Sequence, residues 1–498
     1  MINVCIHGHF YQPPRENPWT GEIELQPGAS PFHDWNERIY HECYKPNTEA
    51  QIVNDLGEVV DRVNNYELIN FNFGPTLLAW MKRKHPETYY NIIEADKKSI
   101  AEHNGHGNAI AMCYSHMIMP LANMNDKITQ VRWGMIDFNY HFGRESEGIW
   151  LPETACNWET IEVLINDGIK YIILDTNQAE KFRKFNDNEW IDVSNGSINP
   201  KQPYRCFSSV NKEKYIDIFF YDGPVSKSVA FDDVLNNSQN LLNKLNTAED
   251  KIFPGDQLIS VATDGETFGH HKKFAERTLA FFLKSLAPKN NLNNVNFGEF
   301  LELHQPEYAV IIKPGEGTSW SCPHGVKRWE DDCGCGGGEG WHQKWRKPLR
   351  EALDWLRDEL VIIYEIHGSV LLKDVWEARN DYINVILNDS VQIKIEFLGL
   401  NSPRFLNETE IEKCFKLLEM QKYSMLMYTS CGWFFSEISG IETVKILEYA
   451  ARAIELAYEV TGNNLEVEFL NKLFKAKSNI PKYRNGKNVY LKLVKKVN

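Results

Sequence analysis

Short apolar runs alternate with amphipathic stretches over roughly the first 300 residues of the chain. Short runs of apolar, β-branched or aromatic residues are typical of buried strands, whereas apolar residues spaced three and four positions apart are typical of helices. We predict strands at residues 2–6, 68–74, 109–114, 148–153, 171–175, 216–221 and 258–263. We predict helices at residues 50–64, 77–85, 88–104, 128–142, 157–167, 231–246 and 274–286.

Strands and helices that alternate in this way predict an α/β fold with a parallel sheet and right-handed crossover connections. Closure of that sheet into a barrel would bring the strand ends onto one face. After residue 345 the pattern changes, and helical stretches follow one another at 347–363, 375–387, 408–427 and 440–460. The expected domains are a barrel at 1–310, a Cys/Gly-rich segment at 311–345 and an α-helical domain at 346–498.

The composition, with 43% hydrophobic and 24% charged residues, is ordinary for a soluble globular protein. The formal net charge of −14 disfavours a nucleic-acid partner, because a nucleic-acid footprint needs clustered basic residues. The 14 Trp and 21 Tyr offer flat apolar faces with a polar edge, which suit sugar rings, although aromatic side chains also fill large cores.

Most of the ten cysteines are scattered along the chain, which is typical of buried thiols in a reducing compartment. The N-terminus has no basic region followed by a long apolar run, so we expect no signal peptide. No uninterrupted apolar stretch reaches membrane-spanning length. We therefore expect a cytoplasmic protein without a membrane partner.

Two carboxylic acids follow predicted strands that lie far apart in the sequence. Glu153 ends the sequence Trp-Leu-Pro-Glu, in which Pro152 disfavours a helix, and Asp264 follows the apolar run at 258–263. Because strand ends carry the chemistry of such folds, we expect the two acids to face each other across about 5 to 7 Å. Such a pair can cleave an acetal, one acid as nucleophile and the other as acid/base. The alternative for either acid is a strand-end cap or a loop ion pair.

Histidines mark the end of the first predicted strand. His7 and His9 stand two positions apart, so their side chains point the same way in an extended segment. With Gln12 and Pro13 they form the sequence His-Gly-His-x-x-Gln-Pro directly after a buried strand. Polar groups crowded at such a place indicate a site, while the alternative is that one or both are structural histidines.

Three segments together resemble the motif set of family 57 glycoside hydrolases. They are residues 7–13 (His-Gly-His-Phe-Tyr-Gln-Pro), 150–153 (Trp-Leu-Pro-Glu) and 263–270 (Thr-Asp-Gly-Glu-Thr-Phe-Gly-His). The resemblance implies an incomplete (β/α)7 barrel followed by a helical domain. It also implies a retaining enzyme on α-glucans or other α-glycosides, such as an amylase, glucanotransferase, branching enzyme, amylopullulanase or α-galactosidase. No metal or other cofactor is expected to be required for catalysis.

By match to the family motifs, Glu153 corresponds to the nucleophile and Asp264 to the acid/base. His7 and His9 fall on the first motif, which lines the position where the sugar is cleaved. His116, after the predicted strand at 109–114, matches the second motif region loosely. The substrate contacts that we expect come from His7, His9, Gln12, His116, Trp150, His270, Trp320 and Trp433.

The chain departs from the characterised members of the family in two places. Residues 429–435 lie where the last motif would come, but Cys431 and Gly432 stand beside Trp433 where the family usually has an acidic residue. Residues 319–340 differ as well. The chain therefore resembles an uncharacterised branch whose C-terminal part is a domain of unknown function similar to DUF3536. The sugar, the linkage and the choice between hydrolysis and transfer stay open.

Three thiols and one imidazole lie close together in the sequence, at Cys322, His324, Cys333 and Cys335. This donor set suits a structural zinc ion, although its spacing is not that of a common zinc finger. Free thiols in a Gly-rich loop are one alternative. A role in substrate binding is another, since Trp320, His324 and Trp329 could reach a sugar.

Two other classes of function use the same residues. Related seven-stranded barrels in mannosidases and polysaccharide deacetylases hold a divalent ion with His and Asp side chains. The equivalent ligands in this chain would be His7, His9, His116 and Asp264. The first motif reads His-Gly-His rather than His-x-Asp, which disfavours this interpretation. The other class is a carbohydrate-binding protein without turnover, and the retained acid pair argues against it.

Overall fold

The computed structural model describes residues 1–336 and 340–496, which divide into two compact units. Residues 337–339 of the predicted Cys/Gly-rich segment lie outside the described residues. Unit 1 consists of Met1–Pro14, Leu25–Met112 and Phe138–Gly315. Unit 2 consists of Arg15–Glu24, Cys113–Asp137 and Glu316–Asn498.

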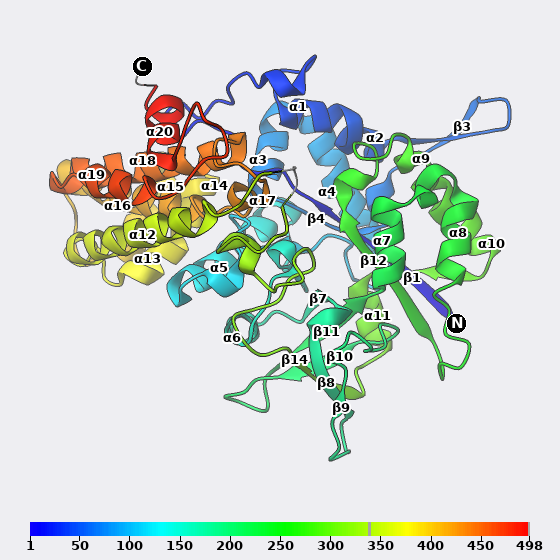
Figure 1. The fold of residues 1–498 in the computed structure, drawn as a ribbon. Helices are drawn as coiled ribbons and strands as arrows, with labels where there is room; N and C mark the ends of the chain where they lie inside the picture. The colour runs from blue at the N-terminus through cyan, green and yellow to red at the C-terminus, as the bar shows by residue number, and fades with distance from the viewer. Residues whose placement is uncertain (337–339, 497–498) are drawn as a thin grey trace. The chain divides into compact units, whose positions relative to one another are not determined.

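Parallel strands form the centre of unit 1 (Figure 1). Neighbouring pairs in this series are joined by single bridges, between Phe71 and Ala109 and between Gly148 and Tyr171. At the far end of the series the Asp222 N–H donates to the Ser260 carbonyl in β12, 2.8 Å away. The strands thus run once around unit 1 with an interrupted ladder, which confirms the incomplete barrel. In order they are β12 (Gln257–Asp264), β1 (Ile2–Phe10), β4 (Asn70–Phe73), β5 (Ala111–Met112), β6 (Ile149–Trp150), β7 (Tyr171–Asp175) and β11 (Tyr215–Tyr221).

The apolar runs of the sequence match the burial of these strands. Every residue of β1 from Asn3 to Phe10 is buried, and so is every residue of β12 before Asp264. Strands covered on both faces read as continuous apolar runs rather than as an alternating pattern. The helices of unit 1 include α3 (Pro75–Lys84), α4 (Pro86–Glu102), α6 (Trp158–Asn166), α7 (Gly223–Phe231), α8 (Ser238–Asn246), α9 (Ala275–Phe281) and α11 (Phe297–Leu303).

A mixed sheet extends from the last two strands of this series. Its strand order is β7-β11-β10-β14-β8-β9, with β10 antiparallel to β11 and β8 antiparallel to β14. Figure 1 shows the added strands running away from the central series. They are β8 (Ala179–Lys184), β9 (Ile191–Asp192), β10 (Tyr204–Phe207) and β14 (Tyr308–Ile312).

One predicted helix is wrong, and another is interrupted. Residues 50–64 form an antiparallel hairpin of β2 (Ala50–Val53) and β3 (Val59–Val63). The side-chain oxygen of Asn54 accepts hydrogen bonds from the N–H groups of Leu56 and Glu58, which fixes the turn. The predicted helix at 231–246 is broken, because Asn237 is extended and caps a new helix, α8.

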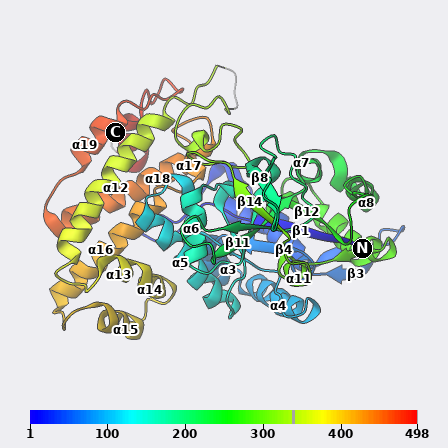
Figure 2. The same ribbon diagram turned by 90° about the horizontal axis from the view of Figure 1, so that it is seen from below.

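Unit 2 is helical, and α12, α16 and α18 lie side by side in it (Figure 2). The helices predicted after residue 345 are confirmed, one of them as the pair α13 and α14. No helix within the described residues is both long and apolar enough to cross a membrane. The main helices are α12 (Arg346–Gly368), α13 (Val375–Asp381), α14 (Ile383–Leu387), α15 (Val391–Asn401), α16 (Glu408–Leu426), α17 (Cys431–Phe434), α18 (Ile441–Thr461) and α19 (Glu466–Leu473).

A buried ion pair ties the early segment Cys113–Asp137 into unit 2. Arg379 on α13 is 1% exposed and donates to the Asp126 carboxylate at 2.8 Å and to the Thr129 hydroxyl at 3.1 Å. The Trp133 indole donates to the Arg379 carbonyl at 3.0 Å. Removing one partner of such a pair leaves an unpaired buried charge, so these contacts hold the first part of α5 (Met124–Phe142) against the C-terminal helices.

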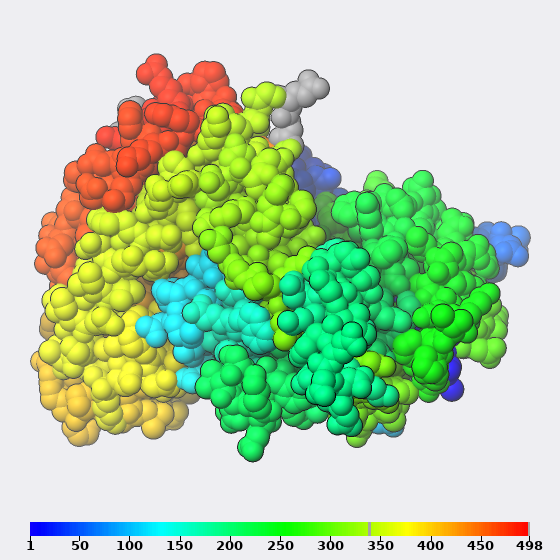
Figure 3. Space-filling model, turned by 60° about the horizontal axis from the view of Figure 1, so that its bottom comes forward, coloured from blue at the N-terminus to red at the C-terminus, as the bar shows by residue number. Residues whose placement is uncertain are grey.

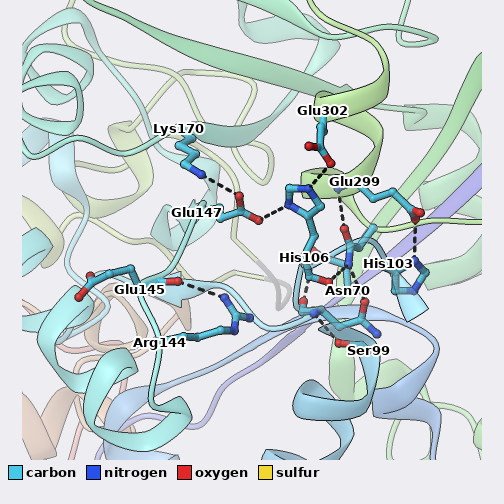
Figure 4. A network of polar contacts seen from close by, with 12 residues as sticks. Asn70, Ser99, His103, His106, Arg144, Glu145, Glu147, Lys170, Glu299 and Glu302 are labelled. Atoms are coloured by element: carbon cyan, nitrogen blue, oxygen red, sulfur yellow. Dashed lines mark hydrogen bonds and ion pairs between the residues drawn. The ribbon is translucent and has the colours of Figure 1, made fainter. Parts of the chain in front are cut away.

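A network of paired charges lies at the amino ends of the strands of unit 1 (Figure 4). His106 contacts the carboxylates of Glu147 and Glu302 at 2.7 and 2.9 Å, and Lys170 donates to Glu147 at 2.9 Å. His103 contacts Glu299 on α11 at 2.6 Å. Each carboxylate of this network therefore has a basic partner.

Candidate active site

Asp264 is the last residue of β12, and the parallel register places it opposite His9 at the end of β1. The next position requires glycine, because a Cβ on Gly265 would lie 2.3 Å from the Phe10 ring. Burial and then the charge of Glu153 raise the pKa of Asp264 to about 7. Solvent reaches the side chain and screens part of this effect, but the direction favours a protonated acid near neutral pH.

Glu153 follows β6 in a turn with an uncommon backbone conformation. Its φ and ψ are 59° and 20°, and the φ of Thr154 is 49°. Gln178 holds this turn, since its side-chain oxygen accepts from the Thr154 hydroxyl at 2.9 Å and its amide donates to the Thr154 carbonyl at 2.8 Å. A left-handed backbone costs a non-glycine residue on the order of 1–3 kcal/mol, and such conformations cluster at functional sites.

The two acids come together in unit 1. The charge of Glu153 is the second cause, after burial, of the raised pKa of Asp264, and charges act in this way only at short range. Both residues stand at the carboxyl ends of parallel strands, although 111 positions separate them along the chain. Two acids, one of them with a raised pKa, thus stand at the same end of the strands of unit 1.

The predicted first-motif histidines form a stack with the predicted tryptophan. The rings of His7 and His9 lie against Trp150, with centroids 4.7 and 5.0 Å away. The ring nitrogens of His7 contact the side-chain oxygens of Asn70 and Asn72 at 2.5 and 3.1 Å. Burial lowers the pKa of His7 to about 4, so its imidazole is neutral. With both nitrogens engaged by amides, His7 is poorly arranged to bind a metal ion.

A further buried carboxyl, Glu266, is absent from the sequence-based prediction. It accepts hydrogen bonds from the Tyr44 hydroxyl at 2.7 Å and from the Tyr11 N–H at 3.0 Å. Burial, with a contribution from the charge of Asp264, raises the pKa of Glu266 to about 8. The signal in the sequence was the spacing Asp-Gly-Glu, which brings a second acid close to Asp264.

The other predicted site residues of unit 1 are Gln12, close in sequence to His7 and His9, and His270, close in sequence to Asp264. The Gln12 amide donates to the Tyr11 carbonyl at 2.9 Å. His270 forms an ion pair with Glu42, a residue that the sequence did not indicate. Glu42 and His270 line a cavity of about 360 Å³, together with Lys45, Lys273 and neighbouring residues.

His116, Trp320 and Trp433 belong to unit 2. His116 is buried, its Nδ1 contacts the Ser430 hydroxyl at 2.6 Å, and its carbonyl accepts from the Ser430 N–H at 3.0 Å. The segments matched to the second and the last motif therefore lie side by side. Trp433 is 1% exposed and stacks on Tyr428, while Trp320 is half-buried.

The predicted cysteine and histidine set is brought together in unit 2. The ligand atoms of all four residues lie within 4.8 Å of one another, and the set could bind a metal such as zinc. Among residues 1–336 and 340–496 it is the only group of three or more His, Cys, Asp or Glu arranged in this way. Its members are Cys322, His324, Cys333 and Cys335.

Comparisons with known proteins match two successive parts of the chain. Residues 10–313 match the sequence model of glycosyl hydrolase family 57, and residues 341–498 match DUF3536, a domain of unknown function. An α-amylase from Pyrococcus furiosus is 21% identical over 295 residues, which cover 58% of this chain and 40% of the relative. A 4-α-glucanotransferase from Thermococcus litoralis is 20% identical over 298 residues, which cover 58% and 39%. The chain thus spans about 40% of the length of these relatives.

A solved structure resembles nearly the whole chain. The exo-type maltose-forming amylase of Pyrococcus sp. ST04 has a TM-score of 0.73 at 14% identity, covering 98% of this chain and 90% of the amylase. At this identity the similarity shows the fold, an α/β region followed by helices.

Proposed function

Because the chain belongs to glycosyl hydrolase family 57, we propose that it cleaves α-glycosidic bonds of α-glucans or related α-glycosides with retention of configuration. Glu153 acts as the nucleophile and Asp264 as the acid/base. The observation that carries this proposal is that Glu153 and Asp264 lie at the carboxyl ends of the parallel strands β6 and β12, with the charge of Glu153 contributing, after burial, to the raised pKa of Asp264. The α-amylase and the 4-α-glucanotransferase among the relatives support an α-glucan as substrate.

In the first step a Glu153 carboxylate oxygen bonds to the anomeric carbon as the bond to the leaving oxygen breaks. Asp264 gives its proton to that oxygen, so the leaving group departs as a neutral hydroxyl. The product is a β-linked glycosyl ester of Glu153. The held turn at Glu153 and Thr154 keeps the nucleophile in one orientation, which favours attack.

In the second step Asp264, now a carboxylate, takes a proton from the incoming hydroxyl. That oxygen attacks the anomeric carbon, the ester bond to Glu153 breaks, and the α configuration is restored. Water gives hydrolysis, and a sugar hydroxyl gives transfer. The stacked rings of His7, His9 and Trp150 form a rigid support beneath this position.

The test combines a Glu153→Gln variant with product analysis on a panel of α-glycosides. We expect kcat/KM to fall by about 10³-fold or more, because no other group replaces the nucleophile. The matched control is Glu159→Gln, which changes an exposed carboxylate of α6. Nuclear magnetic resonance of the first product should show the α anomer. Azide added to Glu153→Ala with an activated aryl α-glycoside should give a β-glycosyl azide.

Full turnover by Glu153→Gln, or a β anomer as the first product, would contradict the proposal. A metal-dependent deacylase would instead release acetate without a new reducing end. Binding of maltooligosaccharides by the wild type without any product would identify a carbohydrate-binding protein. The circular dichroism spectra of the Glu153 and Glu159 variants must match that of the wild type, so that a loss of activity is not caused by a loss of fold.

A further inference from the structure

We propose that unit 2 binds one structural Zn²⁺ ion through Cys322, His324, Cys333 and Cys335, with Arg346 as its buried counter-charge. The glycoside chemistry proposed above uses none of these residues. The inference therefore stands or falls separately from the catalytic proposal.

Three of the six distances within the cluster match those of a tetrahedral zinc centre, and all six are within 4.8 Å. Zn–S bonds of about 2.3 Å and a Zn–N bond of about 2.0–2.1 Å at tetrahedral angles give S···S of about 3.8 Å and S···N of about 3.6 Å. The Sγ of Cys322 lies 3.9 Å from that of Cys333 and 4.0 Å from that of Cys335. The Sγ of Cys335 lies 3.5 Å from the Nδ1 of His324. All three distances fall within a few tenths of an ångström of the expected values.

A buried cation, Arg346, faces the cluster, and within the described residues no carboxylate forms a direct ion pair with it. Arg346, the first residue of α12, is 0% exposed, and its Nη1 donates to the Cys333 sulfur at 3.8 Å. Within residues 1–336 and 340–496 the other hydrogen bonds of its side chain go to the Phe434 and Phe435 carbonyls; the charge of Asp332 acts on it, but no carboxylate lies within ion-pair distance. An unpaired buried charge is costly, so a guanidinium at this place indicates an anionic group beside it.

Zinc binding would supply that anion. Three thiols release their protons as three Zn–S bonds form, and the neutral imidazole adds one Zn–N bond. A divalent ion with three thiolates carries a net charge of −1, which balances the guanidinium of Arg346. Three thiolates and one imidazole in a closed tetrahedral set favour zinc over magnesium or calcium, which prefer oxygen ligands.

The ion would fasten a segment that has little other regular structure. Of the residues described between β14 and α12, only Lys327–Trp329 form a helical turn. Zinc would join the two ends of the stretch from Cys322 to Cys335, and Arg346 would link it to the carbonyls that follow α17. Residues of this segment, lime-green in Figure 3, lie at the surface of unit 2, and His324 is exposed. The ion can therefore enter from solvent.

The first experiment measures metal in the full-length protein purified under reducing conditions without a chelator. We expect about one zinc per chain by plasma mass spectrometry, and iron well below that. Cys335→Ser should lose the metal after dialysis. Cys431→Ser, which changes a cysteine of unit 2 outside the cluster, should retain it.

A second measurement keeps the proposal falsifiable if Cys335→Ser folds poorly. The wild type is stripped with a chelator and titrated with Co²⁺. A tetrahedral centre with three thiolates should give strong visible d–d bands and a thiolate-to-cobalt charge-transfer band, saturating at one equivalent. Wild type that holds no zinc and shows no such spectrum would overturn the site, as would a disulfide found among the three cysteines by thiol counting.

The role of Arg346 has its own test. Arg346→Met keeps the bulk but removes the charge, and it should weaken zinc affinity by about 10–100-fold, as loss of a group that supports metal ligands does. Arg346→Lys should recover part of that affinity. Equal zinc affinity in the wild type and Arg346→Met would show that Arg346 is not the counter-charge.

Discussion

The barrel of unit 1 carries carboxyl groups at both ends of its strands, and their pKa values are shifted in opposite directions at the two ends. At the carboxyl ends, Asp264 and Glu266 have no basic partner within the described residues, and burial raises the pKa of each. At the amino ends, burial would likewise raise the pKa of Glu147, but Lys170 and His106 hold it below its usual value. Position in the fold therefore separates carboxyls that can hold a proton from carboxylates that carry a permanent charge.

The difference shows what a cluster of acids is suited for. The paired carboxylate of Glu147 stabilises the strand starts, and its lowered pKa leaves it without a proton to deliver near neutral pH. Unpaired buried carboxyls stabilise the fold less, but they can exchange protons at working pH. In parallel barrels the chemistry belongs to the carboxyl ends and stability to the amino ends, and this chain follows that division.

The largest expected effect is on activity, from Asp264→Asn. The amide cannot give a proton to the leaving oxygen, so kcat/KM should fall by about 10²–10⁴-fold on an unactivated α-glucan. Because the change removes a carboxyl without an ion pair, the melting temperature should stay within about 2 °C of the wild type. Steady-state kinetics and calorimetry check both parts.

The wild-type pH profile adds to this comparison. Asp264 must be protonated for the first step, so activity should decline as pH rises past about 7. An Asp264→Asn variant with normal kcat/KM, or a profile flat to pH 9, would contradict the assignment.

The second effect is on the pH dependence of stability, from Glu266→Gln. The folded-state pKa of Glu266 is about 8, against 4.5 for an exposed glutamic acid, so the folded state holds the extra proton between these values. Stability of the wild type should therefore fall as pH rises through this window. The glutamine oxygen still accepts from Tyr44 and Tyr11, but it has no charge to bury.

Urea unfolding from pH 5 to pH 7 measures this effect. Relative to the wild type, Glu266→Gln should gain on the order of 3 kcal/mol over the two pH units. A stability difference that stays constant with pH would mean that Glu266 is ionised in the folded protein.

The smallest effect is the loss of a pair at the amino ends, from Glu147→Gln. His106 and Lys170 would lose their shared carboxylate, at a cost of about 1–2 kcal/mol for a partly buried pair. Activity should not change. Glu145→Gln alters an exposed neighbour and should change the free energy of unfolding by less than about 0.5 kcal/mol.

The pH dependence of this pair has a defined sign. The lowered pKa of Glu147 makes its contribution vanish as pH falls below about 4.5. The pKa of His106 is raised by Glu147 and Glu302 against the effect of burial, so its contribution is lost as pH rises above about 6.5. A Glu147→Gln variant that is as stable as the wild type at pH 5.5 would show that the pairs of Glu147 with His106 and Lys170 do not stabilise the fold.

The sequence predicted the parts of the fold in which local pattern and burial agree. β1, β12, α12 and α16 carry long apolar or amphipathic patterns that their surroundings do not override. The hairpin at 50–63 was missed because Ile52, Val59 and Val63 fit helical spacing, while their β-branched shape and the Asn54 turn favour strands.

Other features depend on contacts that no local pattern shows. Asp126 and Arg379 form a buried pair across 253 positions of sequence, so the membership of residues 113–137 in unit 2 was not predictable. The buried state of Glu266 depends on Tyr11 and Tyr44, which come from other parts of the chain. Glu153 could be proposed from its motif and its place after a strand, but its backbone conformation could not.

Because of the left-handed backbone at Glu153, selection for thermal stability and selection for catalytic activity favour different residues at this position. Glycine at this position would relax the backbone and make the protein more heat-resistant, but it would delete the carboxylate on which the proposed reaction depends. A library screened only for survival after heating should therefore accumulate glycine or asparagine at position 153. Such an enrichment would show that Glu153 lowers the thermal stability of the protein in return for the carboxylate that the proposed reaction needs.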